Sequence, residues 1–207
     1  MSILQKLMIS EPRLHCAVMK PSLVIVGLGN PGATYVHTRH NAGFRTVESL
    51  AERYGAGEWS PKAKLLAEVS EGKIGEVPVF FLKPQTFMNR SGESVRKAMD
   101  FYKLDPTFQV LILSDDCDIS LGEIRFRPNG GPGTHNGLKS IVEQIGEGFP
   151  RLRIGLGAAP AGADLANWVL SVPQEEERTK LDAALKGDLV KKVEEFVLGQ
   201  SSPSSKQ

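Results

Sequence analysis

Polar residues that could perform acid–base chemistry are concentrated in four short segments of this sequence. The segments read GNPGATYVHTRHNAGF, KPQTFMNRSG, LSDDCDISLG and RPNGGPGTHNGLKSI. They contain His40, which is followed by an asparagine, and an acidic residue after an apolar run, Asp115. Imidazole has an ordinary pKa of about 6.5 and accepts a proton from water at neutral pH, so His40 is the candidate general base.

The other polar residues of these segments could assist such a base. A carboxylate at a strand end, as expected for Asp115, could orient His40 and stabilise the imidazolium as it forms. The amides of Asn30, Asn89 and Asn136 could hold an ester or peptide carbonyl and donate to a developing oxyanion. Structural roles stay open for all of them, because a loop histidine can bond to backbone and asparagines are common in turns and caps.

The stretch VIVGLGNPG over residues 24–32 matches the G-x-G-x-x-G pattern of dinucleotide-binding proteins. That pattern requires a helix that opens at the third glycine and an acidic residue at the end of the next strand. The residues after Gly32 lack helical periodicity, and Glu48 lies within an amphipathic pattern that predicts a helix. We therefore expect a strand, a tight turn that presents Asn30, and a polar loop, with no dinucleotide.

A metal site and covalent catalysis are also disfavoured. His37-x-x-His40 with Asp115 has the composition of a two-histidine, one-carboxylate site. That spacing brings the two histidines together only on a helix, and residues 34–41 lack helical periodicity. The sequence has no G-x-S-x-G motif, and the acidic neighbours of Cys117 disfavour its thiolate.

A glycine run followed by a predicted helix could bind phosphate. The run covers residues 130–133, and the N-terminus of a helix attracts anions. Strand alternation places Arg125 with Arg127 on one face, and it does the same for Arg151 and Arg153. If the two strands are neighbours, the arginines form a basic patch; the alternative is an ordinary solvated face with the arginine stems packed on the sheet.

Apolar runs bounded by turn residues predict the elements that position these side chains. The order of strands and helices predicts a single α/β domain with a mixed, twisted β-sheet flanked by helices. Loops that bind ligands are then expected after Val26, Leu82, Leu113 and Phe126. The predicted strands are Leu23–Val26, Leu65–Val69, Val77–Leu82, Val110–Leu113, Gly122–Phe126 and Leu152–Leu156; the predicted helices are Phe44–Tyr54, Ser94–Tyr102, Leu138–Ile145 and a charged stretch from Pro173 to about Gly199.

Composition sets the remaining bounds. The chain has 207 residues, of which 41% are hydrophobic and 24% charged, and a net charge of +1. We expect a disordered N-terminal extension over residues 1–18, one catalytic domain over 19–200 and a disordered tail over 201–207. Two cysteines without a pairing pattern favour a reducing compartment, taken as the cytoplasm, and no apolar run is long enough to span a membrane.

In order and spacing, the segments VGLGNPGATYVHTRHNAGF, FLKPQTFMNRSG, GGPGTHNGLKSI and RLRIGLG resemble the signatures of bacterial-type peptidyl-tRNA hydrolases. The resemblance extends from about Leu23 to about Leu198. It implies that family's α/β fold and hydrolysis of the ester between a peptide and the 3′-terminal ribose of tRNA, which recycles tRNA from prematurely released peptidyl-tRNA. It also implies that no cofactor or metal is needed, and we expect a monomer.

The resemblance carries roles over to individual positions. It implies catalytic roles for His40, Asp115 and Asn30, with Asp115 orienting the histidine. It implies peptide and 3′-end binding by one group of residues and tRNA phosphate binding by another. The first group is Tyr35, Phe87, Met88, Asn89 and Asn136; the second is Arg127, Lys139 and Arg153.

Three positions depart from the family pattern, namely Thr134 in place of a usual glycine, Ser114, and Cys117. Thr134 could stiffen or redirect the glycine loop before the predicted helix. A related group of plant organellar proteins keeps the fold but acts in RNA splicing, so an RNA-binding module without catalysis is the alternative. Retention of His40, Asp115 and the three asparagines favours the enzyme.

Overall fold

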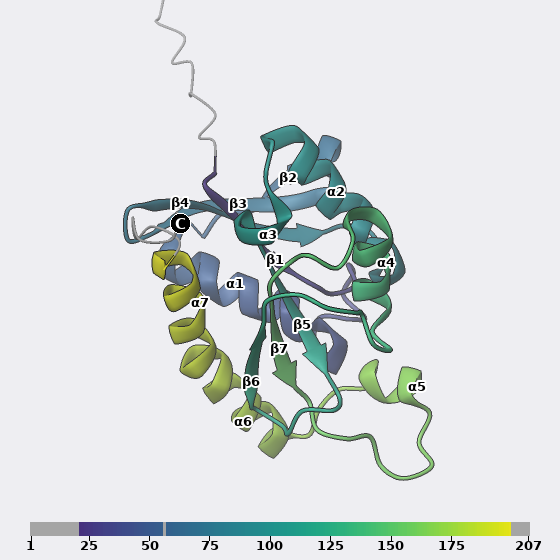
Figure 1. Cartoon of the computed structure of the whole chain (residues 1–207). Helices are drawn as coiled ribbons and strands as arrows, with labels where there is room; N and C mark the ends of the chain where they lie inside the picture. The colour runs from purple at the N-terminus through teal and green to yellow at the C-terminus, as the bar shows by residue number, and fades with distance from the viewer. Residues whose placement is uncertain (1–20, 56, 200–207) are drawn as a thin grey trace, which may run out of the picture.

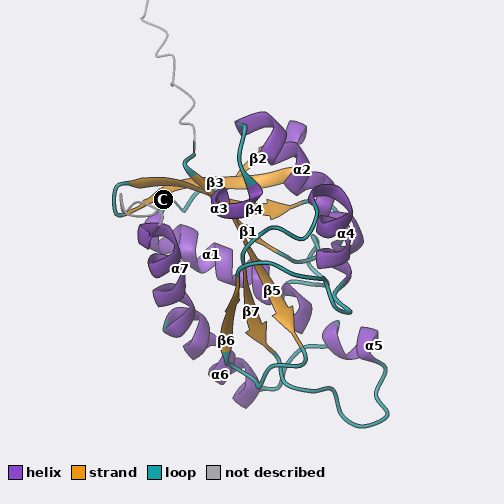
Figure 2. Ribbon diagram, viewed as in Figure 1, coloured by secondary structure: helices purple, strands orange, loops and turns teal. Residues whose placement is uncertain are grey.

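The computed structural model describes residues 21–55 and 57–199 and shows a seven-stranded mixed sheet with helices on both faces (Figures 1 and 2). The strand order is β2-β3-β4-β1-β5-β7-β6. β1 pairs in parallel with β4 and β5, and β5 in parallel with β7, whereas the β2–β3, β3–β4 and β6–β7 pairs are antiparallel. The strands are β1 Leu23–Gly27, β2 Ser60–Lys62, β3 Ala67–Ile74, β4 Val77–Pro84, β5 Val110–Asp116, β6 Ile124–Arg127 and β7 Arg151–Gly155.

Two apolar cores, one on each face of the sheet, hold the helices in place. Alternation along β1 directs Leu23 and Ile25 to the core under α1, α6 and α7, and Val24 and Val26 to the core under α2 and α4. Both strand faces are buried, as expected for parallel strands covered on two sides. The helices are α1 Ala42–Tyr54, α2 Ser91–Tyr102, α3 Pro106–Gln109, α4 Asn136–Ile145, α5 Leu165–Val169, α6 Glu175–Lys186 and α7 Asp188–Gly199, with 3-10 turns η1 Arg39–Asn41, η2 Ala63–Leu65 and η3 Met88–Arg90.

The structure confirms the α/β class, the single mixed sheet and all six predicted strands, with corrections to their bounds. The strand predicted at Leu65–Val69 runs over Ala67–Ile74 instead, because Leu65 belongs to a 3-10 turn that ends at the left-handed Leu66. The C-terminal stretch was predicted as one unit and forms two helices, because Gly187 leaves the helical region with φ −106° and ψ −92°. β2, α3 and α5 were not predicted, since each is shorter than six residues and has no buried residue.

Two further expectations concern membrane-spanning helices and the ends of the chain. None of the helices over 21–55 and 57–199 is long and apolar enough to cross a membrane. The extension expected over residues 1–18 and the tail expected over 201–207 lie outside the described residues.

One of the four loops expected to bind ligands begins at the opposite edge of the sheet from the other three, although it does line the cavity next to His40. β1, β4 and β5 run in parallel, so the loops after them leave the same edge of the sheet. β6 runs antiparallel to β7, with Arg127 opposite Arg151 at the start of that strand, so the loop after Phe126 leaves the opposite edge. The glycine segment that follows must therefore return along the sheet before it reaches α4.

Close contact between two glycines brings α1 onto the ends of β1 and β5. A Cβ atom on Gly27 would lie 2.2 Å from the carbonyl oxygen of Gly43, and one on Gly43 would lie 2.5 Å from the carbonyl oxygens of Leu113 and Leu28. The Leu28 amide donates to Leu113, and the Phe44 amide donates to Leu28. Because η1 directly precedes α1, this contact places Arg39–Asn41 over the carboxyl end of β5.

We expect Gly43→Ala to destabilise the protein by roughly 3 kcal/mol, because the added methyl group meets backbone atoms that cannot move independently of the sheet. Gly148→Ala is the matched control, since its Cβ would meet only a Thr107 methyl group at 3.8 Å. Chemical denaturation of both variants measures the difference. Equal stabilities would show that the β1–α1 contact is not close-packed.

Candidate active site

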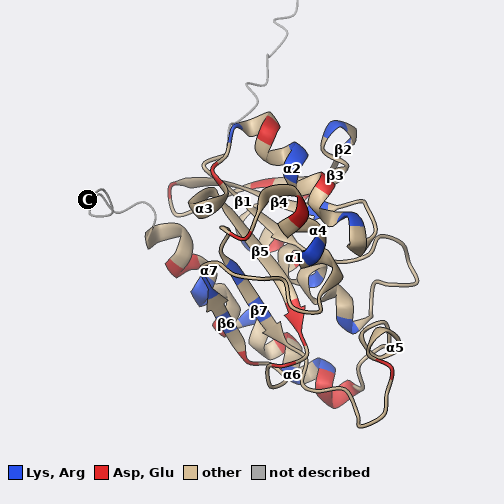
Figure 3. Cartoon of the chain, turned by 45° about the vertical axis from the view of Figure 1, so that its right-hand side comes forward, with Lys and Arg blue, Asp and Glu red and all other residues tan. Residues whose placement is uncertain are grey.

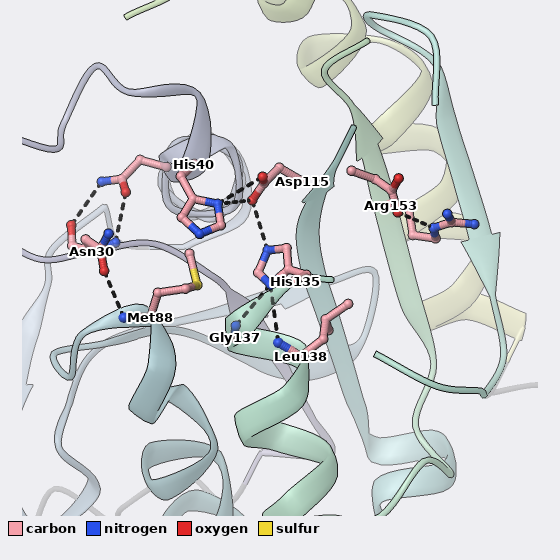
Figure 4. A network of polar contacts seen from close by, with 10 residues as sticks. Asn30, His40, Met88, Asp115, His135, Gly137, Leu138 and Arg153 are labelled. Carbon is pink, nitrogen blue, oxygen red and sulfur yellow. Dashed lines mark hydrogen bonds and ion pairs between the residues drawn. The ribbon is translucent and has the colours of Figure 1, made fainter. Parts of the chain in front are cut away.

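Asp115, at the carboxyl end of β5, forms the centre of the site. Its side chain is buried, with 2% of the residue exposed, and it lies against His40 of η1 (Figure 4). The Nδ1 atom of His40 lies 2.9 Å from Asp115 Oδ2 and 3.0 Å from Oδ1. The structure thus brings together two residues that are 75 positions apart and that the sequence predicted to act as a pair.

A second histidine, His135, binds the same carboxylate and was not predicted. Its Nε2 atom lies 3.0 Å from Asp115 Oδ1. Its Nδ1 atom accepts hydrogen bonds from the Gly137 and Leu138 amides and so caps α4. Since an acceptor nitrogen carries no proton, the ring hydrogen lies on Nε2 and is donated to Asp115.

The asymmetry between the two histidines defines the role of each. His135 uses both nitrogens, whereas His40 Nε2 makes no hydrogen bond to any described residue. The free nitrogen of His40 is therefore the one available to accept a proton. The sequence did contain a signal for His135, namely its position directly before the start of the predicted helix at the end of a glycine loop.

Burial and the contact between the two side chains shift the pKa values of His40 and Asp115. Burial alone lowers the pKa of His40, but the charge of Asp115 and its hydrogen bond raise it, and the net result is above the ordinary 6.5. Burial alone raises the pKa of Asp115, but attraction to His40 and His135 and their hydrogen bonds place it well below its usual range. Asp115 is therefore an anion throughout the physiological range, and His40 is a stronger base than a free imidazole.

Asn30 is held rigidly beside His40. Its backbone amide donates to Asn41 Oδ1 at 2.8 Å, and its backbone carbonyl oxygen accepts from Asn41 Nδ2 at 3.0 Å. The Met88 amide donates to Asn30 Oδ1 at 2.8 Å, which orients the side chain (Figure 4). Because Oδ1 is occupied, the Nδ2 group is the free end of the side chain and can only donate. Asn41 was not among the predicted site residues.

The predicted residues fall into two groups, of which one lines a cavity and the other does not. A cavity of about 470 Å³ is lined by His40, Asp115 and His135 together with Asn136, Arg127 and Arg153. Tyr35 and Phe87 do not line this cavity, and their rings meet edge to face with centroids 6.3 Å apart. Phe87 is 56% exposed although it is a large apolar residue. Asn89 and Lys139 are exposed and do not line the cavity, and Met88 is buried.

The basic patch is present but partly neutralised. Arg125 pairs with Arg153 across the β6–β7 ladder, and Arg127 with Arg151, so the strands are neighbours as the patch required. Arg151 is buried and donates to the carbonyl oxygens of Gly130 and Gly131; burial, and repulsion from Arg127, lower its pKa to about 10. Arg153 is bound to Asp116 at 2.6 Å. Arg151 thus holds the glycine loop, and Arg127 is the exposed one of the three arginines that line the cavity.

Two of the backbone amides at the start of α4, where the sequence suggested a phosphate site, already have a partner. The Gly137 and Leu138 amides are occupied by His135 Nδ1, so they are not free for an anion.

The G-x-G-x-x-G pattern of residues 24–32 has a structural explanation as well. The segment after Gly32 forms turns and then η1, and the first α-helix begins only at Ala42.

Within the described residues, one group has the composition of a metal site. The ligand atoms of His40, Asp115 and His135 all lie within 4.8 Å of one another. His37, which the sequence offered as a partner, is exposed and does not belong to this group. The nitrogen atoms that would bind a metal already contact Asp115, which gives each of them a partner without an ion.

Comparison with known proteins identifies the family. A sequence model described as peptidyl-tRNA hydrolase matches residues 24–206. The chain belongs to the peptidyl-tRNA hydrolase family. The peptidyl-tRNA hydrolase of Chloroflexus aggregans is 49% identical over 156 residues, which cover 74% of this chain and 82% of that protein. A chloroplastic peptidyl-tRNA hydrolase of Arabidopsis thaliana is 44% identical over 182 residues, which cover 87% of this chain and 62% of that protein.

A solved structure supports the same conclusion for the fold. The peptidyl-tRNA hydrolase of Acinetobacter baumannii superimposes with a TM-score of 0.80 and 41% sequence identity, covering 88% of this chain and 92% of that one. Within this family framework, two departures from the expected pattern lie on the cavity. Thr134 is exposed and lines the cavity. Burial and the charges of Asp115, Asp116 and Asp118 raise the pKa of Cys117 to about 12, so its thiol stays protonated.

Asp115→Asn should lower the pKa of His40 from above 6.5 to below it. The substitution keeps the burial, which lowers this pKa, and removes the negative charge, which raises it. Histidine ring titration by NMR measures the change, with Asp118→Asn, an exposed position in the same loop, as the control. A His40 pKa that is the same in both variants would contradict the assigned role of Asp115.

Proposed function

We propose that this protein hydrolyses the ester bond between a peptide, or an N-blocked amino acid, and the 3′ ribose of tRNA. Membership of the peptidyl-tRNA hydrolase family supports the substrate class. The observation that carries the proposal is the His40–Asp115 pair, in which His40 Nδ1 is bound and Nε2 is free beside the cavity.

His40 activates a water molecule in this proposal. Its Nε2 removes a proton from the water, and the resulting hydroxide oxygen attacks the ester carbonyl carbon. The C–O bond to the ribose then breaks, and His40 returns its proton to the departing ribose oxygen. Asp115 keeps Nδ1 protonated and stabilises the imidazolium between these two steps, and no covalent enzyme intermediate is required because the ester is already activated.

Asn30 and its neighbours bind the acyl side of the ester. The free Nδ2 group of Asn30 donates to the carbonyl oxygen and to the negative charge that develops on it. Tyr35, Phe87 and Met88, with the amide of Asn89, form the adjoining surface for the peptide. Neutral amides cannot compensate a free α-ammonium group, so ordinary aminoacyl-tRNA is a poor substrate.

The cavity that His40 and Asp115 line receives the tRNA end in this proposal. Asn136 lines the cavity next to His135 and contacts the 3′-terminal ribose in this proposal. Arg127, Lys139 and Arg153 bind backbone phosphates of the acceptor stem, and such contacts weaken with added salt. Binding of a phosphate by Arg153 has to compete with its ion pair to Asp116.

The protein acts as a monomer, without a metal or organic cofactor, in the cytoplasm. The hydrogen bonds within the His40–Asp115–His135 group support the independence from metal, since they orient the base without an ion. Relatives described as chloroplastic and mitochondrial share the fold family, so the compartment is set by features other than the site.

We expect wild-type protein to release N-acetylphenylalanine from N-acetylphenylalanyl-tRNA and to leave phenylalanyl-tRNA largely intact. His40→Ala should lower kcat by about 10³-fold or more, since the general base is lost. His37→Ala is the matched control, because His37 lies in the same loop but is exposed. Acid-precipitable radiolabel measures cleavage, and a chelator should not change the rate.

Two outcomes would contradict the proposal. Tight binding of tRNA without any cleavage by wild-type protein would favour the RNA-binding module over the enzyme. Equal losses in His40→Ala and His37→Ala would show that the histidine effect arises from the loop and not from proton transfer.

A further inference from the structure

The residue directly before the proposed base, Arg39, is buried and reaches away from the catalytic group. Only 7% of Arg39 is exposed. Its Nη1 donates to Ser171 Oγ at 2.8 Å, and its Nη2 donates to Glu177 Oε2 at 2.5 Å. Its backbone amide donates to the Ser171 carbonyl oxygen at 3.0 Å. Three hydrogen bonds thus connect the turn that carries His40 to residues more than 130 positions later.

These bonds fix the segment that contains α5. The Arg39 guanidinium lies over the ring of Trp168, with 4.9 Å from its central carbon to the ring centroid. Ser171 Oγ also donates to the Trp168 carbonyl oxygen at the end of α5, and Glu177 caps the start of α6 through the Gln174 amide. One buried cation therefore holds the end of α5 and the start of α6 together.

Apart from this contact, α5 has little to hold it. None of its five residues, all within the described chain, is buried. In Figures 1 and 2 it lies at the end of a long loop beside the carboxyl end of β5. Trp168 is partly buried and packs against the core under α1, α6 and α7. A helix of five residues without a buried face is not stable by itself, so its position depends on such specific contacts.

The same short helix forms one wall of the catalytic cavity. Leu165, Ala166 and Val169 line the cavity together with His40 and Asp115. Leu165 is 39% exposed, so its apolar side chain is accessible to a ligand in the cavity. An apolar wall next to the proposed base suits the flat face of a nucleobase attached to the reacting ribose.

We propose that Arg39 is a positioning residue that holds α5 as the apolar wall for the 3′-terminal nucleotide, and that it sets affinity for the tRNA end and not the rate of ester cleavage. This inference rests on the proposed function. Arginine suits the task because its planar group donates to two acceptors while its face packs on an indole ring. Lysine could not make all of these contacts at once.

The chain offers a direct probe of α5, because it has two tryptophans, Trp59 and Trp168. In a Trp59→Phe background, the fluorescence of Trp168 reports whether α5 is in place. Arg39→Met should raise acrylamide quenching of Trp168 about twofold and shift its emission to longer wavelength. Ser171→Ala, which removes one of the three bonds, should give a smaller change in the same direction and serves if Arg39→Met folds poorly.

Kinetics on N-acetylphenylalanyl-tRNA give the second readout. Arg39→Met should raise KM about tenfold, because the loss of one hydrogen bond to a charged group changes an equilibrium constant by about that factor. It should change kcat by less than about threefold. Leu165→Ala should raise KM as well, and the double variant should be no worse than the more affected single variant, because both act through α5. Arg96→Met is the control, since Arg96 forms an ion pair with Asp100 on α2 and does not line this cavity.

The results separate the possible failures. A fall in kcat without a change in KM or in Trp168 quenching would overturn the inference and leave Arg39 as a support for the His40 turn. Additive effects of Arg39→Met and Leu165→Ala on KM would overturn it too. If the wild-type protein cleaves nothing, the proposed function fails, but weaker binding of deacylated tRNA with a mobile Trp168 in Arg39→Met would still support the role of α5.

Discussion

A single buried carboxylate organises this structure. Asp115 has lost its contact with water, and a desolvated anion is stable only where hydrogen-bond donors compensate it. Two imidazoles supply those donors from different elements, one from the turn before α1 and one from the cap of α4. The charge that activates His40 is therefore also the charge that ties η1 and α4 to the end of β5 (Figure 4). In Figure 3 the acidic residues at this end of β5 are coloured red.

The backbone is arranged to make this convergence possible. Gly27 and Gly43 let α1 rest directly on the strand ends, which places His40 and Asn41 above β5. Arg151, stacked on Phe149 and bonded to two glycine carbonyls, holds the loop that returns from β6 and delivers His135. Arg39 performs the corresponding task for α5. Buried arginines with backbone or ion-pair partners thus fix the two segments that border the cavity.

The sequence predicted the parts of the site that have local signals. Apolar alternation located the strands, and the position of Asp115 after a buried run located the carboxyl end at which it meets His40. The fold class was predicted from the order of strands and helices and the family from the quoted segments, and both are confirmed. The asparagine at position 30 was predicted to face a ligand, and its clamp by Asn41 and Met88 is consistent with that.

The residues that were missed depend on long-range geometry. His135 reaches Asp115 only because β6 runs antiparallel and its loop returns along the sheet, and no local pattern reveals strand direction. Arg39 and Glu177 are 138 positions apart, and each looks like an ordinary surface charge in the sequence. α5 has too few residues to show periodicity, so the apolar wall of the cavity was invisible before the chain was folded.

The pH dependence of kcat/KM on N-acetylphenylalanyl-tRNA tests the role of the His40–Asp115 pair most directly. Only the unprotonated His40 can accept a proton, so kcat/KM should rise with pH through a single ionisation whose midpoint lies above 6.5. At higher pH it should reach a plateau. A profile without this acid limb, or one with its midpoint well below 6.5, would show that a base paired with Asp115 does not activate the water.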